Sequence, residues 1–155
     1  EYTLEIYGAG PLRNELQHKI DVLGLNDRVF LMGTFSDIHK RIASATIFIM
    51  SSDYEGMPNA LLEAMALSLP CISTDYSPGS LREFMTDGVN GLIVPCGDPI
   101  ALANAMNRLL DNENLRRDIG NRAKEVQDKF APDKIYDKWE HYFYRIAGHY
   151  GKQVL

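Results

Sequence analysis

One stretch of the chain decides the fold: residues 46–66, with the sequence TIFIMSSDYEGMPNALLEAMA. It opens with an apolar run at 46–50, continues through a polar loop, and becomes rich in Leu, Ala and Met after Pro58. A short continuous apolar run is typical of a strand buried on both faces, and Pro is favoured at the first position of a helix. The stretch therefore predicts a strand, a loop and a helix over residues 58–69.

The same alternation extends in both directions along the chain. Apolar runs at 4–7, 29–32, 71–74 and 92–94 predict further strands, and helical patterns lie between them at 12–23, 37–45 and 80–85. Strands that alternate with helices at this spacing favour right-handed crossovers and a parallel sheet. The sequence therefore predicts an α/β fold in which helices cover most strands on both faces.

The last third of the chain is helical by its apolar spacing. Amphipathic patterns at 100–110, 115–130 and 135–146 predict three helices. In the third, Trp139 falls on the apolar stripe and is predicted to pack in the core, whereas the tyrosines off the stripe are available to another domain. We therefore predict one domain over residues 1–130 and a helical tail over 131–155.

Composition limits the class of protein further. The 155 residues are 45% hydrophobic and 24% charged with a net charge of −5, which favours one folded domain and argues against a partner bound by phosphate neutralisation, such as nucleic acid. Cys71 and Cys96 lie in apolar segments and are predicted to be core residues in a reducing compartment. Because the chain starts with Glu1 and enters a strand-like run at once, we expect a piece of a longer protein.

The loop and helix after residue 50 are the best candidate for a ligand site. They follow a buried strand, and open α/β sheets bind ligands at the carboxyl ends of their strands. Met57 would precede the helix and cannot cap it, so the amides at 59–61 are predicted to lack partners. Free amides at a helix N-terminus accept phosphate.

Two glutamates flank this helix start. Glu63 is the one charged residue between Gly56 and Thr74, and a buried carboxylate needs a hydrogen-bonding partner. It lies five residues beyond Pro58, about 7.5 Å along the axis, which suits a carboxylate that accepts from two vicinal hydroxyls while a phosphate rests on the amides. Glu55 would face whatever lies beyond the phosphate. The alternative is that Glu55 is a solvated loop residue and Glu63 part of an exposed helix face.

Five motifs in order resemble those of retaining nucleotide-sugar glycosyltransferases of family 4, which have the GT-B architecture. The segment EGMPNALLEAMA at 55–66 is similar to the family's E-x7-E motif. The other four are GAGPLR at 8–13, VFLMG at 29–33, LPCISTD at 69–75 and DGVNGLIVP at 87–95. The resemblance covers about residues 4–130 and implies a Rossmann-like parallel sheet with flanking helices, the C-terminal half of a GT-B fold, with a helical C-terminal tail.

The resemblance also implies roles for individual residues. Glu55 would be the catalytic residue and would contact the hydroxyls of the donor sugar, while Glu63 would accept from the ribose. The remaining donor-binding residues would act through their backbone, with the amides at 59–61 on the distal phosphate: Gly8, Gly10, Gly56, Met57, Asn59, Ala60 and Leu61.

The implied function is transfer of a sugar from a nucleotide-diphosphate-sugar, of UDP or GDP type, to an acceptor hydroxyl with retention, in polysaccharide or glycoconjugate biosynthesis. The resemblance implies no metal and no other cofactor. This chain would be the donor-binding part of a cytoplasmic hexosyltransferase. An N-terminal domain would bind the acceptor sugar or glycolipid, and peripheral contact of the full protein with the inner face of the membrane stays open.

Some features depart from the family pattern or leave alternatives. The family's Arg and Lys pair would precede Glu1, so we expect the chain alone to bind donor weakly and to transfer nothing. The runner-up functions are a nucleotide-sugar epimerase of the same architecture and a non-catalytic nucleotide-sugar-binding module. A dinucleotide site at Gly8 is disfavoured because the third glycine of the fingerprint would fall at Arg13. Residues 77–80 are interpreted as a connecting turn or a donor-side loop.

Overall fold

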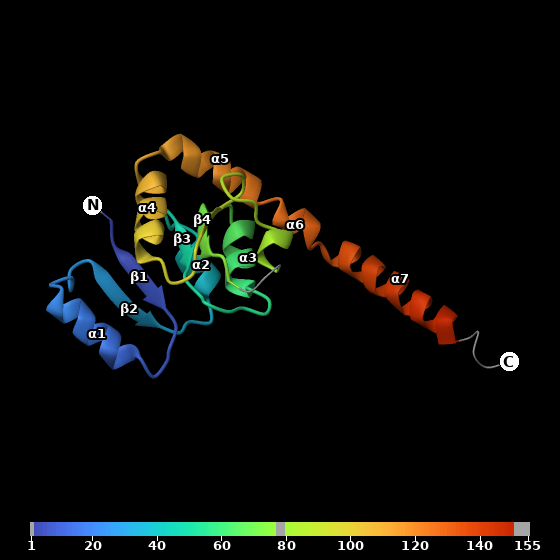
Figure 1. Ribbon diagram of the computed structural model, residues 1–155, viewed down its shortest axis with the longest axis horizontal. Helices are drawn as coiled ribbons and strands as arrows, with labels where there is room; N and C mark the ends of the chain where they lie inside the picture. The colour runs from blue at the N-terminus through green and yellow to red at the C-terminus, as the bar shows by residue number, and fades with distance from the viewer. Residues whose placement is uncertain (1, 77–79, 151–155) are drawn as a thin grey trace. The chain divides into compact units, whose positions relative to one another are not determined.

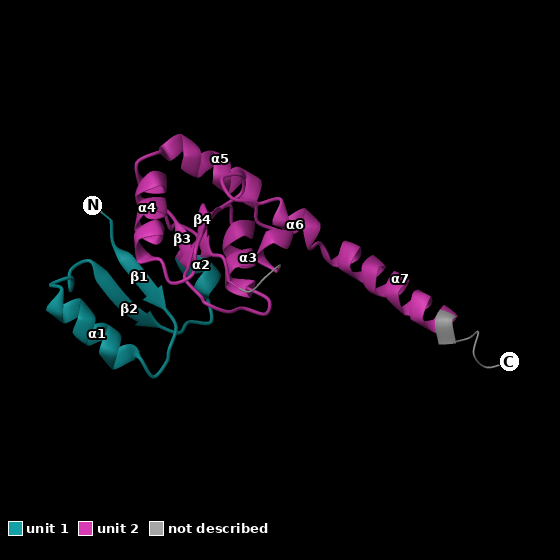
Figure 2. Ribbon diagram, in the orientation of Figure 1, with its two compact units in different colours: residues 1–41 teal, residues 42–155 magenta. Residues whose placement is uncertain are grey.

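The computed structural model describes residues 2–76 and 80–150, and the chain divides into two compact units, residues 1–41 and 42–155 (Figure 2). The first unit holds a two-stranded sheet and the second a three-stranded sheet, and both sheets are parallel (Figure 1). The predicted α/β class with parallel strands and flanking helices is therefore confirmed.

In the first unit, β1 (Leu4–Tyr7) pairs with β2 (Val29–Gly33), and α1 (Arg13–Val22) connects them. The guanidinium of Arg13 donates to the carbonyl of Leu31 at 3.0 Å, which ties the start of α1 to β2. Leu4 and Phe30 are 38% and 39% exposed, so the prediction that these strands are buried on both faces is wrong. Among the described residues of this unit, α1 is the helix that connects the two strands. A single helix covers only one face of the sheet, so side chains on the other face stay exposed.

In the second unit the strand order is β3 (Phe48–Met50), β4 (Cys71–Thr74) and β5 (Leu92–Val94). All four residues of the central strand β4 are buried, including the polar Ser73 and Thr74, as predicted for a strand covered on both faces. The crossover helix α3 (Asn59–Ala66) lies between β3 and β4, and the 3₁₀ helix η1 (Leu81–Glu83) precedes β5. The short α2 (Ile38–Ile42), which lies at the boundary of the two units in the sequence, precedes β3.

Two capped helices complete the core of this unit. The side chain of Asp98 accepts from the amide of Ala101 at 2.8 Å at the start of α4 (Pro99–Leu110). Asn112 accepts from Leu115 in the same way at the start of α5 (Glu113–Ala123). These caps satisfy amides that would otherwise have no partner. Both helices bury their apolar stripes in one cluster with β4 and β5, formed by Ile72, Leu92, Val94, Ala105, Leu109 and Ile119.

The helix predicted over 115–130 is interrupted. It forms α5 and then the short α6 (Val126–Lys129), separated by a tight turn in which the amide of Glu125 donates to the carbonyl of Arg122 at 3.1 Å. The apolar spacing gives no sign of this turn, because Ala123 and Val126 are both buried on either side of it. Within α5, Gly120 allows close approach to Ser68, since a Cβ there would overlap the Ser68 carbonyl.

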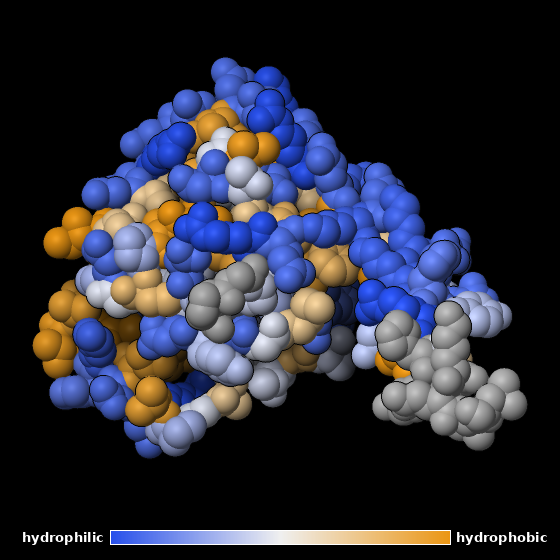
Figure 3. All heavy atoms as spheres, turned by 45° about the vertical axis from the view of Figure 1, so that its right-hand side comes forward, coloured by the Kyte–Doolittle hydropathy of each residue, from blue (hydrophilic) through white to orange (hydrophobic). Residues whose placement is uncertain are grey.

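The last helix, α7 (Pro132–Tyr150), follows α6 (Figure 1). Trp139 is 54% exposed, so the prediction that it packs in the core is wrong. Its ring stacks instead on Phe143 of the same helix, with centroids 5.6 Å apart. Figure 3 shows apolar side chains in separate areas of a largely hydrophilic face. Among the described residues, no helix is both long enough and apolar enough to cross a membrane.

Candidate functional site

The loop between β3 and α3 lies at the carboxyl end of β3, and it carries the first of the two predicted glutamates. Glu55 is half-buried, and its Oε1 accepts a hydrogen bond from the Ser52 hydroxyl at 2.8 Å. The carboxylate is therefore held by its own loop and is not the freely solvated side chain that the alternative hypothesis described. A carboxylate can accept about four hydrogen bonds, so Glu55 retains capacity for a ligand.

A hydrogen bond from the neighbouring strand fixes the start of this loop. The buried hydroxyl of Thr74, at the end of β4, donates to the carbonyl of Ser52 and lies 3.4 Å from the carbonyl of Met50. The thiol of Cys96 lies 3.8 Å from the same Ser52 carbonyl. Cys96 is exposed, so its predicted place in the core is wrong, whereas Cys71 is buried as predicted, and burial raises the pKa of its thiol.

The helix α3 begins one residue later than predicted. Pro58 is the N-cap residue, with φ −82° and ψ 69°, which is the geometry of an inverse γ-turn. In this turn the amide of Asn59 donates to the carbonyl of Met57 at 2.9 Å, so the prediction that this amide lacks a partner is wrong. No side chain caps α3, and among the described residues nothing accepts a hydrogen bond from the amides of Ala60 and Leu61.

The second glutamate lies on the outer face of α3. Glu63 is exposed and interacts with other groups of the protein, so it does not bear the cost of burial that the sequence argument assigned to it. With Leu62 and Ala66 it lines a groove of about 200 Å³, and Val126 and Gln127 of α6 and the adjacent Phe130 form the other side. The side-chain amide of Gln127 connects the two sides of the groove by donating from Nε2 to the carbonyl of Ala66 at 2.9 Å.

The predicted glycines of the phosphate loop belong to the first unit. Gly8 follows β1 with φ +133°, a conformation that side chains rarely adopt, and its amide donates to the carbonyl of Gly33 at 2.8 Å. Gly10 has an ordinary φ, and a Cβ there would meet nothing within 4 Å. The other seven predicted residues, Glu55, Gly56, Met57, Asn59, Ala60, Leu61 and Glu63, lie in the second unit within one loop and the helix that follows it.

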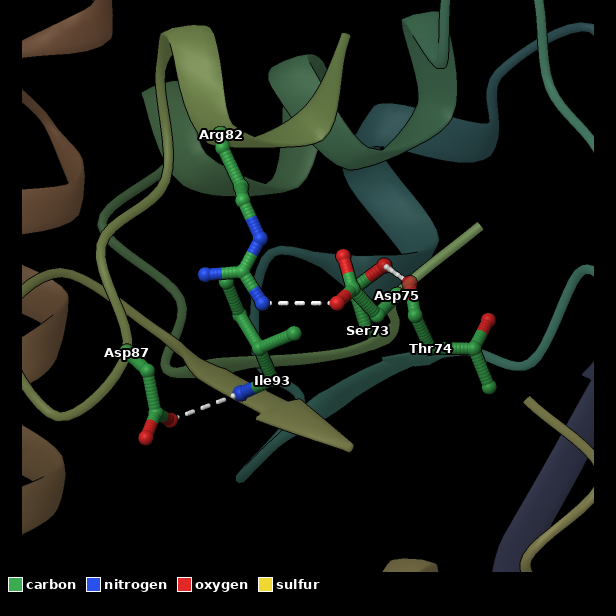
Figure 4. Close-up of polar contacts among 6 residues, drawn as sticks. All are labelled: Ser73, Thr74, Asp75, Arg82, Asp87 and Ile93. Atoms are coloured by element: carbon green, nitrogen blue, oxygen red, sulfur yellow. Dashed lines mark hydrogen bonds and ion pairs between the residues drawn. The ribbon is translucent and has the colours of Figure 1, made fainter. Parts of the chain in front are cut away.

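Two side chains that the sequence did not single out, Tyr76 after β4 and Arg82 on η1, lie close to the end of the sheet that carries Thr74. Arg82 on η1 pairs with Asp75 at 2.6 Å (Figure 4), so one of the acidic side chains near the site has a cationic partner. Tyr76 has a side chain with no exposed surface, and burial, followed by the negative charge of Glu55, raises its pKa to about 12. The sequence shows an arginine seven residues after Asp75, so this ion pair could have been predicted. Nothing in the sequence indicates that Tyr76 is buried. Residues 77–79, predicted to form a turn or donor-side loop, lie outside the described residues.

The segment DGVNG at 87–91 has a structural role. The carboxylate of Asp87 accepts from the amide of Ile93 at 2.9 Å (Figure 4), which fixes the start of β5. The side chain of Asn90 accepts from the Thr86 amide at 2.7 Å and donates to the Phe84 carbonyl at 2.9 Å. These bonds close the turn between η1 and β5 and set the position of β5 beside β4.

The part of the chain that the structure describes contains no group of three or more His, Cys, Asp or Glu side chains able to hold a metal ion.

The arrangement of strands and helices is that of GT-B glycosyltransferases. The Anabaena protein HepE, solved in complex with UDP, superimposes with a TM-score of 0.85 at 23% identity, over 93% of this chain and 41% of that chain. TarM of S. aureus gives a TM-score of 0.82 at 26% identity, over 90% of this chain and 28% of that chain. These likenesses define the class of fold: a Rossmann-like domain of a GT-B protein.

Sequence comparison gives the family. Residues 1–126 match the family Glycosyl transferases group 1, and the chain belongs to this family. An exopolysaccharide phosphotransferase of Streptomyces coelicolor is 38% identical over 147 residues, which are 94% of this chain and 16% of that protein. An N-acetyl-alpha-D-glucosaminyl L-malate synthase of Bacillus anthracis is 31% identical over 92% of this chain and 37% of its own length. The chain thus spans well under half of each of these relatives.

Proposed function

We propose that this chain is the donor-binding part of a glycosyltransferase that moves a sugar from a nucleotide-diphosphate-sugar to an acceptor hydroxyl. The observation that carries the proposal is the half-buried carboxylate of Glu55, held by Ser52 in the loop before α3, with Glu63 eight residues further along the chain, inside α3. This spacing places one acidic side chain on each side of the helix start.

The start of α3 supports binding of a diphosphate. The amides of Ala60 and Leu61 lie in the first turn of an uncapped helix, where backbone N–H groups and the helix dipole favour an anion. On this proposal Glu55 accepts from hydroxyls of the donor sugar, and Glu63 accepts from the ribose. The backbone of Gly56 and Met57 then lies against the sugar.

The glycines of the first unit have a matching role in the proposal. Neither packing nor backbone conformation requires glycine at position 10, where a Cβ would have open space around it. Because a glycine has no side chain, its backbone is open to close approach by a ligand, so we assign Gly8 and Gly10 to the phosphates of the donor.

The chemical step on this proposal is transfer with retention of configuration, as in family 4. The bond between the anomeric carbon and the diphosphate oxygen breaks, the acceptor oxygen bonds to the anomeric carbon, and the acceptor proton leaves with the nucleoside diphosphate. This half of the enzyme would act by stabilising the charge that develops on the leaving diphosphate, which is often the largest single contribution to catalysis. We propose that the reaction uses no resident metal or cofactor.

The proposal also concerns where the acceptor binds. The S. coelicolor and B. anthracis relatives extend well beyond the region shared with this chain. We therefore propose that another domain of the whole protein binds the acceptor, a sugar or glycolipid of polysaccharide or glycoconjugate biosynthesis. Turnover would require both domains, and a cytoplasmic location with peripheral membrane contact is part of the same proposal.

A thermal-shift panel of UDP-, GDP- and ADP-sugars against the full-length protein tests the proposal. The best donor is expected to raise the melting temperature, and Glu55→Gln and Glu63→Ala are each expected to reduce that shift. Glu113→Ala, which removes an exposed glutamate from α5, is the matched control and should leave the shift unchanged. A shift that survives Glu63→Ala undiminished would refute the ribose assignment.

Product analysis with the full-length protein distinguishes a glycosyltransferase from an epimerase and from a binding module. Incubation of the best donor with a mixture of acceptors should yield a glycosylated product and free nucleoside diphosphate. Conversion of the donor into an epimeric nucleotide-sugar, or release of the free epimeric sugar, would instead indicate an epimerase. Binding without either reaction would indicate a non-catalytic nucleotide-sugar-binding module.

A further inference from the structure

Two buried hydroxyl groups flank the connection between β4 and η1. Among the side chains that the structure describes, Tyr76 Oη and Ser80 Oγ are buried polar atoms with no hydrogen-bond partner. A buried polar group without a partner costs free energy, and native proteins contain few of them. Tyr76 is the larger anomaly, because its side chain has no exposed surface and a phenylalanine would fill the same space.

The backbone around Tyr76 connects it to the loop of Glu55. Tyr76 lies two residues beyond Thr74, whose hydroxyl donates to the carbonyl of Ser52. Ser52 in turn donates its own hydroxyl to Glu55. The strands that lead into the two segments are neighbours, with Met50 of β3 paired to Ser73 of β4. Tyr76 and Glu55 therefore emerge from the same edge of one sheet.

The negative charge of Glu55 affects the pKa of the Tyr76 phenol. Burial raises the pKa of Tyr76, and Glu55 is the charged group that raises it further. A phenol is protonated at neutral pH and can donate a hydrogen bond, and Glu55 is an acceptor with unused capacity.

We propose that Tyr76 is a positioning residue for Glu55, and that its hydroxyl donates to the Glu55 carboxylate when the donor sugar occupies the site. The hydroxyl is enclosed by protein, so it acts through Glu55 and not by touching the donor. With Ser52 and Tyr76 both donating, the carboxylate is held in one orientation toward the sugar hydroxyls. This inference rests on the proposed function.

The test is a double-mutant cycle in the full-length protein, with donor affinity and kcat/KM measured for the donor that gives the largest thermal shift. Tyr76→Phe is expected to lower kcat/KM about tenfold in the native background, the size of effect expected for a hydrogen bond to a charged group. In the Glu55→Gln background the same change is expected to cost less than about twofold, because the carboxylate through which Tyr76 acts is gone. Tyr136→Phe, on the exposed ring of Tyr136 in α7, is the control and should change neither quantity.

Stability without ligand gives a second readout. Because the hydroxyl has no hydrogen-bond partner among the described residues, Tyr76→Phe is expected to leave the melting temperature unchanged or to raise it. A lower melting temperature would overturn the inference, since it would mean that the hydroxyl already has a structural partner. Equal losses of kcat/KM in both backgrounds, or no loss in either, would overturn it as well. A native protein that binds no nucleotide-sugar would overturn the proposed function together with this inference, whereas the other outcomes overturn this inference alone.

Discussion

The hydroxyl of Thr74 donates to the carbonyl of Ser52, joining the last residue of β4 to the loop that carries Glu55. This bond continues the pairing of β3 with β4 beyond the end of β3, which stops at Met50. It therefore couples the position of the candidate catalytic loop to the most buried strand of the sheet. A loop fixed in this way can hold a carboxylate in a defined place before any ligand arrives.

We expect Thr74→Val to weaken both the fold and the site. Valine keeps the shape and suits a buried strand, but it leaves the Ser52 carbonyl without this donor, which should lower the free energy of unfolding by about 1–2 kcal/mol. Donor affinity should fall as well, because the Glu55 loop loses its connection to β4. Urea unfolding and donor titration measure the two effects, and Thr46→Val, at an exposed position before β3, is the control. Unchanged donor affinity in the Thr74 variant would show that the loop is held by other contacts.

Much of this architecture was predictable from local sequence. The strands at 4–7, 71–74 and 92–94 have the predicted bounds, because short runs that are mostly apolar or β-branched and are bounded by turn residues favour strands of that length. The predicted start of α3 was one residue too early. The fixed φ of Pro58 is compatible both with the N-cap and with the first helical position, so the sequence does not distinguish the two.

Contacts between distant segments were not predictable in the same way. The pairing of Thr74 with Ser52 follows from strand register, which the apolar pattern does not encode. The pair of Asp75 with Arg82 spans a loop whose path local spacing does not define. The turn at 124–125 interrupts a helix without disturbing its apolar stripe, and Trp139 lies on a stripe that the described residues leave exposed.

Gly120→Ala tests the packing of α5 on the segment before β4. A Cβ at position 120 would overlap the carbonyl of Ser68, a backbone atom that cannot simply rotate away. We expect the free energy of unfolding to fall by about 1–3 kcal/mol, as for overpacking in a core, although alanine is the better helix former. Gly148→Ala in α7, where a Cβ meets nothing within 4 Å, is the control and should leave stability unchanged or slightly raised. Equal effects of the two substitutions on chemical denaturation would contradict the close approach.

Tyr76 should make stability depend on alkaline pH. Its pKa is raised from 10.0 to about 12 in the folded protein, chiefly by burial and then by Glu55. A raised pKa means that the folded state favours the protonated phenol, so the titration of Tyr76 leaves stability unchanged below about pH 10 and lowers it as the pH rises toward 12. The free energy of unfolding of the native protein should therefore fall more steeply between pH 9.5 and 11.5 than that of Tyr76→Phe, as measured by denaturant titration. Parallel slopes for the two proteins would mean that the phenol titrates normally.

Metal independence is tested by chelation. On the proposed function, the diphosphate is stabilised by the first turn of α3 and by the rest of the protein, so exhaustive dialysis against EDTA should leave sugar transfer unchanged. Added Mg²⁺ or Mn²⁺ should likewise have little effect on kcat. Loss of turnover after dialysis, restored by one divalent cation, would show that a metal takes part.

The pair of Asp75 and Arg82 should affect the donor through charge more than it affects the fold. Arg82 is well exposed, with its side chain 60% accessible, and exposed ion pairs contribute little to stability. Arg82→Gln should therefore leave the melting temperature almost unchanged, but it would leave the negative charge of Asp75 uncompensated next to Thr74, the residue that holds the Glu55 loop. We expect donor affinity to fall, with a larger loss at 20 mM than at 300 mM salt, because screening weakens the repulsion between Asp75 and the diphosphate. The control is Arg122→Gln, which removes a cation from α5 and should cause no such salt-dependent loss. A loss of affinity that is the same at both salt concentrations would argue for a direct contact between Arg82 and the donor.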